Sequence, residues 1–213
     1  IKLQNFRSHS FTQLNTNHLV VCIIGPNGSG KTTMMSIVLD ILKADTGEYS
    51  WFGLPNSHEE RKRIGALLET PNFYHYLSAQ KNLEIAAAIK GRGKNDILAA
   101  LEKVNLAHRK DSKFSTYSLG MKQRLAIASC LLGNPDLLVF DEPTNGLDPE
   151  GIAEIRTLIL RLAKEGKTII MASHLLDEVE KVCSHVIILK KGVSLYCGKV
   201  SAMTSTKGYF ILQ

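Results

Sequence analysis

The amino-acid sequence predicts an α/β fold: a mainly parallel sheet core, an antiparallel β subdomain and an inserted helical lobe. Apolar, β-branched runs alternate with segments of helical periodicity, which is the pattern of a parallel sheet covered on both faces. A glycine-rich loop at 25–32 stands where a strand gives way to a helix, and a polar helical stretch separates it from the next buried strand. The 213 residues therefore suit one domain, with its core at about 1–68 and 135–213 and its lobe at about 69–134.

The first part of the chain combines the strand before the glycine loop with the antiparallel sheet. Leu19–Ile24 is an apolar run that predicts a buried strand, and Thr33–Leu42 predicts a helix that Asp45–Gly47 terminates. Glu48–Phe52 alternates in polarity and holds two large aromatic residues, so it predicts an antiparallel strand. Further strands of that sheet are expected at Lys2–Phe6 and Phe11–Leu14.

Helices dominate the middle of the chain, and the sheet resumes after them. Leu83–Ile89 and Ile97–Val104 have the clearest helical periodicity. Asp148–Glu150 is a strong helix start, because Asp can cap a helix and proline suits its first position. That helix is expected to reach Glu165 and stop at Gly166. The other expected elements are strands at Leu137–Phe140 and Thr168–Ala172, a helix at Leu175–Val182, and a hairpin of Val186–Leu189 and Val193–Tyr196.

The composition is that of an ordinary globular domain, with 44% hydrophobic and 22% charged residues. The apolar runs are too short to span a bilayer, and no signal peptide is expected. The four cysteines form no C-x-x-C pair, which predicts reduced, mostly buried thiols in a cytoplasmic protein. The net charge of +6 would suit an anionic partner. However, the basic residues are scattered except at Arg61–Arg63, which we expect on a solvated helix face.

The glycine-rich loop matches the phosphate-binding pattern G-x-x-x-x-G-K-[ST]. Its glycines let the backbone turn N–H groups toward phosphates, and the following helix presents its positive end to the same charge. Lys31 is expected to bridge the β- and γ-phosphates, and the Thr32 hydroxyl to ligate Mg²⁺. The residues expected to bind the nucleotide here are Gly25, Pro26, Asn27, Gly28, Ser29, Gly30, Lys31, Thr32 and Thr33.

Two carboxylates follow the predicted strand Leu137–Phe140. Asp141 can hold Mg²⁺ directly or through water, and Glu142 can orient or deprotonate an attacking water. Acidic residues at strand ends are common, so the pair gains its meaning from the phosphate-binding loop earlier in the chain. Together the two motifs predict a hydrolase of a nucleoside triphosphate.

The segment Tyr117–Leu125 resembles the signature motif of ATP-binding cassette (ABC) ATPases, usually written L-S-G-G-Q. Ser118 and Gly120 match the motif, whereas Leu119 and Met121 replace a glycine and the glutamine. The matching residues also open a predicted helix, whose N-terminus makes a further anion site. In the family that site completes the nucleotide pocket of a second ATP-binding subunit, so the resemblance implies a homo- or heterodimer with ATP and Mg²⁺ as ligands.

The resemblance extends to residues on both sides of the signature motif. Asn145–Asp148 resembles the D-loop, which implies a role for Asp148 at the nucleotide, and His174 stands where the family has a histidine touching the γ-phosphate. Glu69 occupies the position of the Q-loop glutamine, where a glutamate can still reach Mg²⁺ or the attacking water. The catalytic residues implied are Glu142, His174 and Glu69, and the metal ligands implied are Thr32, Glu69 and Asp141.

Glu69 and the variant signature motif resemble those of ATPases from bacitracin- and lantibiotic-type peptide export and immunity systems. The resemblance implies a subunit that powers transport through separate integral-membrane subunits, from the inner face of the cell membrane. These partners are expected to contact the lobe near Phe73–Leu77. An alternative remains, in which Glu69 is one tolerated substitution in a generic exporter.

A second class of function competes with the transporter. Leu3–His9 resembles the opening of chromosome-maintenance and recombination ATPases related to SMC proteins, and the positive charge agrees with a DNA-associated role. Such proteins usually separate their nucleotide motifs by a long coiled coil, and no heptad run occurs here. Nucleic acid is therefore not the expected partner.

Overall fold

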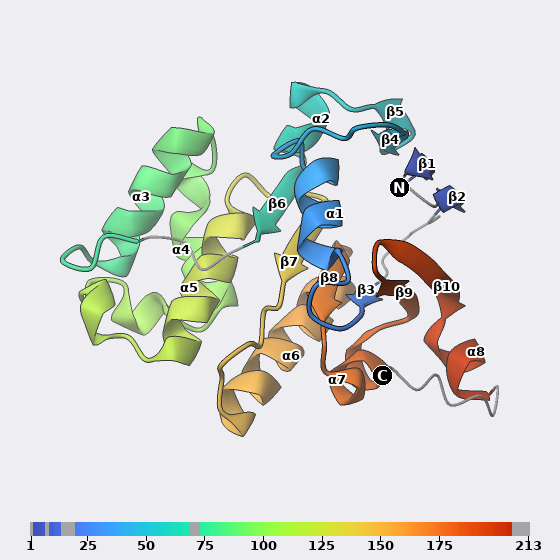
Figure 1. Cartoon of the computed structure of the whole chain (residues 1–213). Coiled ribbons are helices and arrows are strands. Elements are labelled where there is room, and N and C mark those ends of the chain that lie inside the picture. The colour runs from blue at the N-terminus through green and yellow to red at the C-terminus, as the bar shows by residue number, and fades with distance from the viewer. Residues whose placement is uncertain (1, 7–8, 14–19, 69–72, 206–213) are drawn as a thin grey trace.

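The computed structural model describes residues 2–6, 9–13, 20–68 and 73–205, and its centre is a six-stranded sheet (Figure 1). The strands follow one another across the sheet in the order β10–β9–β3–β8–β7–β6. All but β10 are parallel, and β10 pairs antiparallel with β9 at one edge. The predicted α/β class with a mainly parallel sheet is confirmed. The strands are β3 (Val20–Ile24), β6 (Ile64–Leu67), β7 (Leu137–Asp141), β8 (Thr168–Ser173), β9 (His185–Lys190) and β10 (Val193–Lys199).

Successive residues of the sheet strands point into two separate cores, because side chains alternate between the faces of a strand. Val21 and Ile23 pack with the residues of α1 (Lys31–Val38) on one face. Cys22 and Ile24 belong to a larger core on the other face, shared with α5 (Leu119–Leu131) and α6 (Pro149–Lys164). This two-sided burial explains why the strands read as continuous apolar runs in the sequence.

A separate antiparallel sheet in the order β2–β1–β4–β5 confirms the predicted β subdomain. Lys2 pairs with both Gln13 and Ser50, so β1 is the strand that joins the N-terminal hairpin to β4. β2 begins at His9 rather than at Phe11, and Leu14 lies outside the described residues. The strands of this sheet are β1 (Lys2–Phe6), β2 (His9–Gln13), β4 (Glu48–Trp51) and β5 (Leu54–Pro55).

The chain between β6 and β7 forms the predicted helical lobe, which lies beside the sheet and away from the antiparallel strands (Figure 1). Its last helix, α5, packs closely on β6, where a Cβ on Gly65 would stand 2.3 Å from the Cys130 carbonyl oxygen. The helices of the lobe are α3 (Ala79–Lys90), α4 (Ile97–Lys103), α5, and the 3₁₀ turns η1 (Lys94–Asp96), η2 (Ala107–Arg109) and η3 (Phe114–Thr116). Across the described ranges, no helix combines the length and the apolar character needed to cross a bilayer.

The C-terminal part contains the predicted elements in order. Asp148 caps α6, because its Oδ1 accepts a hydrogen bond from the Gly151 N–H at 2.9 Å, and the helix gives way at Gly166 as expected. The β9–β10 hairpin turns through Lys191 and Gly192, both with positive φ. The remaining helices of the described residues are α7 (Leu176–Val182) and α8 (Val200–Ser205), and α8 was not predicted.

The predicted helix Thr33–Leu42 is wrong at its C-terminal end, since α1 stops at Val38. Asp40 adopts a left-handed conformation with φ 63°, and the following N–H of Ile41 donates back to the Ser36 carbonyl at 2.8 Å. A residue in this conformation closes a helix whatever the periodicity of the next apolar side chains. Ile41 and Leu42 are consequently exposed.

The basic run Arg61–Arg63 lies at the end of α2 (His58–Lys62). Arg63 is not on the helix face but caps it, and its guanidinium stacks on the Phe52 ring at 3.8 Å and pairs with Asp136 at 2.8 Å. Lys62 and Arg63 are exposed, as expected, whereas Arg61 is half-buried and pairs with Asp40 at 3.1 Å. Arg63 also links the residue before β7 to the antiparallel subdomain.

All four cysteines are free and three are buried, as the sequence predicted. Burial raises the pKa of Cys130 to about 11, and a hydrogen bond with Cys183 together with burial raises the pKa of Cys22. We expect a thiol reagent to label only Cys197 in the native protein. Partial burial raises the pKa of that thiol, so labelling should quicken as the pH is increased and more thiolate forms. Mass spectrometry of labelled peptides tests this, and labelling of Cys22 before unfolding would contradict it.

Candidate functional site

The phosphate-binding loop connects β3 to α1, as its position in the sequence predicted. Its glycines serve different purposes. Gly28 and Gly30 have φ of 76° and 99°, which glycine adopts readily, and a Cβ on Gly28 would meet none of the described residues within 4 Å. Gly25 is instead required for packing, since a Cβ there would lie 2.2 Å from the Leu189 carbonyl oxygen. The loop thus rests on β9 while its outer turn stays open.

Lys31 begins α1 and is buried beneath the loop. Its Nζ donates a hydrogen bond to the Gly25 carbonyl at 2.7 Å and lies 3.8 Å from Glu142 Oε1. The ammonium group is therefore held between the loop and a carboxylate, close to where the loop can bind phosphate. A phosphate oxygen can take the place of the loop carbonyl as a stronger, charged acceptor.

Thr32 and Asp141 come from different elements but meet directly. The Thr32 hydroxyl donates to Asp141 Oδ2 at 2.6 Å, which joins the first turn of α1 to the end of β7. Hydroxyl and carboxylate oxygens are the ligands that Mg²⁺ prefers. The pair therefore fits a magnesium site, because both oxygen ligands already lie side by side at the carboxyl end of β7.

Glu142 and His174 form a second direct contact at this edge. His174 Nδ1 and Glu142 Oε2 are 2.8 Å apart, so the histidine after β8 and the glutamate after β7 share a hydrogen bond. Glu142 has φ 47°, an uncommon backbone conformation for a residue other than glycine. Its N–H donates a hydrogen bond to the Ala172 carbonyl at 3.1 Å. The strained backbone turns the carboxylate toward Lys31 and His174.

The predicted residues Lys31, Thr32, Asp141, Glu142 and His174 therefore come together at the carboxyl ends of β3, β7 and β8. In open α/β sheets this edge is where ligands bind. The predicted residue Glu69 lies outside the described residues.

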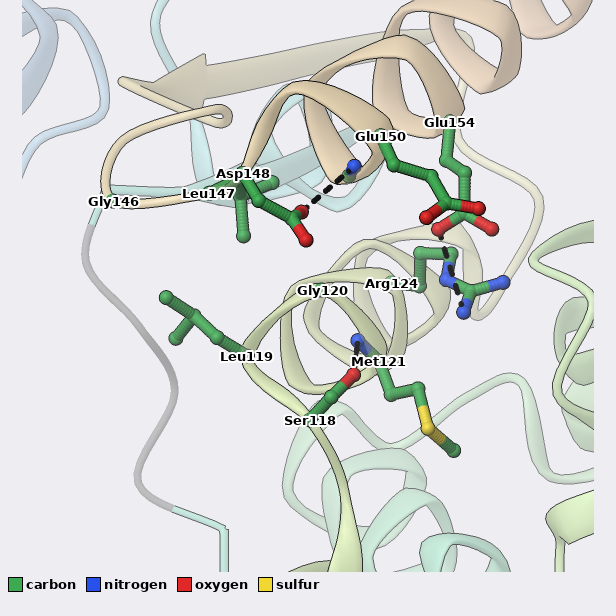
Figure 2. Close-up of a pocket in the computed structure, with 11 residues that line it drawn as sticks. Ser118, Leu119, Gly120, Met121, Arg124, Gly146, Leu147, Asp148, Glu150 and Glu154 are labelled. Atoms are coloured by element: carbon green, nitrogen blue, oxygen red, sulfur yellow. Dashed lines mark hydrogen bonds and ion pairs between the residues drawn. The ribbon is translucent and has the colours of Figure 1, made fainter.

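Ser118, Gly120 and Asp148 lie apart from this cluster, in a cleft of about 460 Å³ between the N-terminal turns of α5 and α6 (Figure 2). Ser118 Oγ accepts a hydrogen bond from the Met121 N–H at 3.3 Å, so it caps α5 in the same way that Asp148 caps α6. No residue of the phosphate-binding loop lines this cleft. The structure thus does not bring the signature residues to the Lys31 cluster of their own chain. Sequence reasoning assigned no role to Arg124 and Glu154, which line the cleft from facing helices.

Comparisons with known proteins agree with this geometry. A family model described as ABC transporter matches residues 12–145. The chain is 47% identical over 174 residues to the bacitracin transport ATP-binding protein BcrA of Bacillus licheniformis, covering 79% of this chain and 57% of that protein. It is 40% identical over 173 residues to the lantibiotic transport ATP-binding protein SrtF of Streptococcus pyogenes, covering 81% and 76%.

Solved structures of ABC transporter components have a similar fold. One, a cassette of an ABC transporter in its ADP conformation, has a TM-score of 0.83 at 24% identity and covers 93% of this chain and 90% of its own. Another, cbiO1 of Clostridium perfringens, has a TM-score of 0.80 at 28% identity and covers 97% and 89%.

These similarities distinguish between the two families that the sequence resembles. The resemblance to bacitracin and lantibiotic transport ATPases is confirmed, and the DNA-associated alternative is not supported. The chain spans 57% of the length of BcrA. The family model and the identity to these relatives show that the chain belongs to the ATP-binding proteins of the ABC transporter family.

Proposed function

We propose that the chain is the ATP-hydrolysing subunit of a transporter that exports a peptide or drug, or gives immunity to one. The observation that carries this proposal is the joined cluster in which Thr32 contacts Asp141 and Glu142 contacts both Lys31 and His174. BcrA and SrtF are a bacitracin and a lantibiotic transport ATP-binding protein, which supports the substrate class.

ATP binds with its phosphates against the open turn of the glycine loop and the N-terminus of α1. Lys31 Nζ exchanges its loop carbonyl for the β- and γ-phosphates. Mg²⁺ would be held by Thr32 and Asp141, where it would offset charge on the phosphates. Glu142 orients and deprotonates the attacking water, and His174 holds that carboxylate through its Nδ1. Glu69 is proposed to reach the same site from the loop after β6.

The transporter would need partners that this chain does not supply. We propose separate integral-membrane subunits and a second ATP-binding subunit, identical or different, with the cassette in the cytoplasm at the inner face of the membrane. Tyr74 and Tyr76 support the expected contact near Phe73–Leu77, because these two exposed rings stack edge to face at 5.9 Å on the lobe. Exposed aromatic pairs of this kind are favoured anchors in protein interfaces.

The proposed role of Lys31 predicts a binding defect. Lys31→Ala should weaken ATP binding by roughly 10- to 100-fold, because a charge-assisted contact to phosphate is lost. Lys81→Ala is the matched control, since Lys81 pairs only with Glu84 on the lobe surface among the contacts described. Calorimetric titration with ATP measures both. Equal affinities for the two variants would contradict the assignment of the loop.

The transport function is tested by whether the protein associates with membrane subunits. Full-length protein expressed with its neighbouring membrane subunits should copurify with them, and the complex should hydrolyse ATP only when Mg²⁺ is present. If the purified protein hydrolyses ATP but never associates with membrane subunits, the proposed ATPase activity stands and the proposed role in transport is wrong.

A further inference from the structure

The first turns of α5 and α6 are neighbours within one chain (Figure 2). A Cβ on Gly120 would lie 4.0 Å from Gly151 Cα, so the two helices meet through glycine. A Cβ on Gly146 would lie 3.5 Å from Leu119 Cδ2, so the leucine that replaces a signature glycine rests beside the D-loop. The signature segment (Tyr117–Leu125) and the D-loop segment (Asn145–Asp148) are therefore parts of one surface.

One charged side chain crosses from α5 to α6 at this surface. Arg124 Nη2 lies 3.5 Å from Glu154 Oε2, and Figure 2 shows the guanidinium reaching toward that carboxylate. Its Nη1 donates to the Val104 carbonyl, just beyond α4, at 3.5 Å. The Arg124 side chain is only 14% exposed, whereas that of Glu154 is 43% exposed. A single residue thus ties α4 and α5 of the lobe to α6 of the core.

The charges around the cleft explain why an arginine is needed there. Asp148, Glu150 and Glu154 line it from the α6 side, and Arg124 is the basic residue among the residues that line it. The Nε of Arg124 is buried and has no hydrogen-bond partner among the described residues. The guanidinium therefore keeps one donor unused while its Nη groups bridge α6 and the end of α4. A planar group with several fixed donors suits this task better than an ammonium.

We propose that Arg124 is a positioning residue, which fixes the signature segment relative to the D-loop of the same chain so that both meet the second ATP-binding subunit in one geometry. The inference rests on the proposed function, because it requires signature residues that complete another subunit's nucleotide site. Holding two binding segments in their joined arrangement before association lowers the entropy lost when the dimer forms. Arg124 acts through Ser118 and Gly120 and does not itself touch the nucleotide.

A second ion pair between lobe and core provides the matched control. Lys103 of α4 contacts Glu165, the residue that caps the far end of α6. If Arg124 served only to attach the lobe, the loss of Lys103 would have the same effect. Of the two ion pairs, Arg124–Glu154 borders the signature segment and Lys103–Glu165 does not, so a positioning role is specific to Arg124.

The test uses the chain with Glu142→Gln, in which bound ATP should persist. The measured quantity is the MgATP concentration at which half of the protein is dimeric in sedimentation experiments. Arg124→Gln and Glu154→Gln should each raise it about 3- to 10-fold, the range expected for a partly buried ion pair present in both subunits. Lys103→Gln should change it less than about twofold. The exchange Arg124→Glu with Glu154→Arg restores the ion pair but not the hydrogen bond to Val104, so it should recover part of the lost dimerisation.

Two further measurements separate positioning from simple damage. The affinity of the monomer for ATP and the thermal midpoint should be the same for Glu154→Gln as for its parent, since Glu154 is half exposed. The inference is overturned if Arg124→Gln dimerises like its parent, if Lys103→Gln matches it, or if the charge exchange fails to recover dimerisation. If the Glu142→Gln parent itself does not dimerise with MgATP, the proposed shared site fails first.

Discussion

Glu142→Gln should retain MgATP binding and lose roughly 10²- to 10⁴-fold in turnover, the range for removal of a general base. The amide has the shape of the carboxylate and can keep the contact with His174, but it cannot accept a proton from water. Its loss of charge also removes the contact at 3.8 Å from Lys31, so that lysine becomes more available to phosphate. Steady-state ATPase assays and calorimetric ATP titration measure the two effects separately.

Glu180→Gln is the control for this experiment. Glu180 is an exposed carboxylate on α7 and does not line the cleft between α5 and α6. It should hydrolyse ATP like the unaltered protein. Turnover by Glu142→Gln at the rate of Glu180→Gln would remove Glu142 from the role of base and leave His174 as the next candidate at the same edge.

Much of the site was predictable because its signals are local. The glycine loop, the strand before it and the helix after it are contiguous, so one pattern fixes the conformation, the positive φ of Gly28 and Gly30 included. Asp148 and Pro149 likewise specify a helix start within two residues. Acidic and histidine residues after predicted parallel strands could be expected at one edge, and the structure joins them there.

Other features depend on contacts that no local pattern encodes. The end of α1 at Val38 follows from the left-handed turn at Asp40, which competes with an unbroken apolar periodicity. The contact of Arg124 with Glu154 depends on how α5 and α6 pack, and a lone Arg and Glu carry no sign of it in the sequence. The exposed stack of Tyr74 and Tyr76 depends on a loop held by Asn82, whose Oδ1 accepts the Tyr74 N–H at 2.7 Å.

Gly120→Ala should abolish ATP-dependent dimerisation while leaving the monomer folded. Among the described residues beyond its own helical turns, the new Cβ would meet only Gly151 Cα, at 4.0 Å, which is an ordinary contact. Alanine also favours a helix by up to about 1 kcal/mol over glycine, so the thermal midpoint should stay level or rise. Any loss of function must then come from the surface that faces the second subunit. Dimerisation of Gly120→Ala at the MgATP concentration of its parent would contradict the proposed interface.

Ser118→Arg adds a stronger perturbation at the same surface, and Ser57→Arg controls for the lost helix cap. Ser57 caps α2 as Ser118 caps α5, each through a hydrogen bond of 3.3 Å from the N–H three residues on. Both substitutions should cost about 1 kcal/mol of stability, but only Ser118→Arg should block the dimer. An arginine side chain at that position would occupy the space proposed for the phosphates of the nucleotide bound to the second subunit.

A mixing experiment then asks whether each site is built from two chains. Lys31→Ala and Ser118→Arg should each be inactive alone, because every site in either dimer lacks one part. If the chain pairs with itself head to tail, a mixed dimer holds one site with both defects and one site with none, since the intact loop faces the intact signature segment. Equal mixing should therefore recover up to about a quarter of the unaltered rate, as half of random dimers are mixed and each has one working site. If activity is not recovered in a mixture shown to exchange subunits, either Ser118 acts within its own chain or the working partner is a different protein. Mixing with a copurified second cassette distinguishes these two explanations.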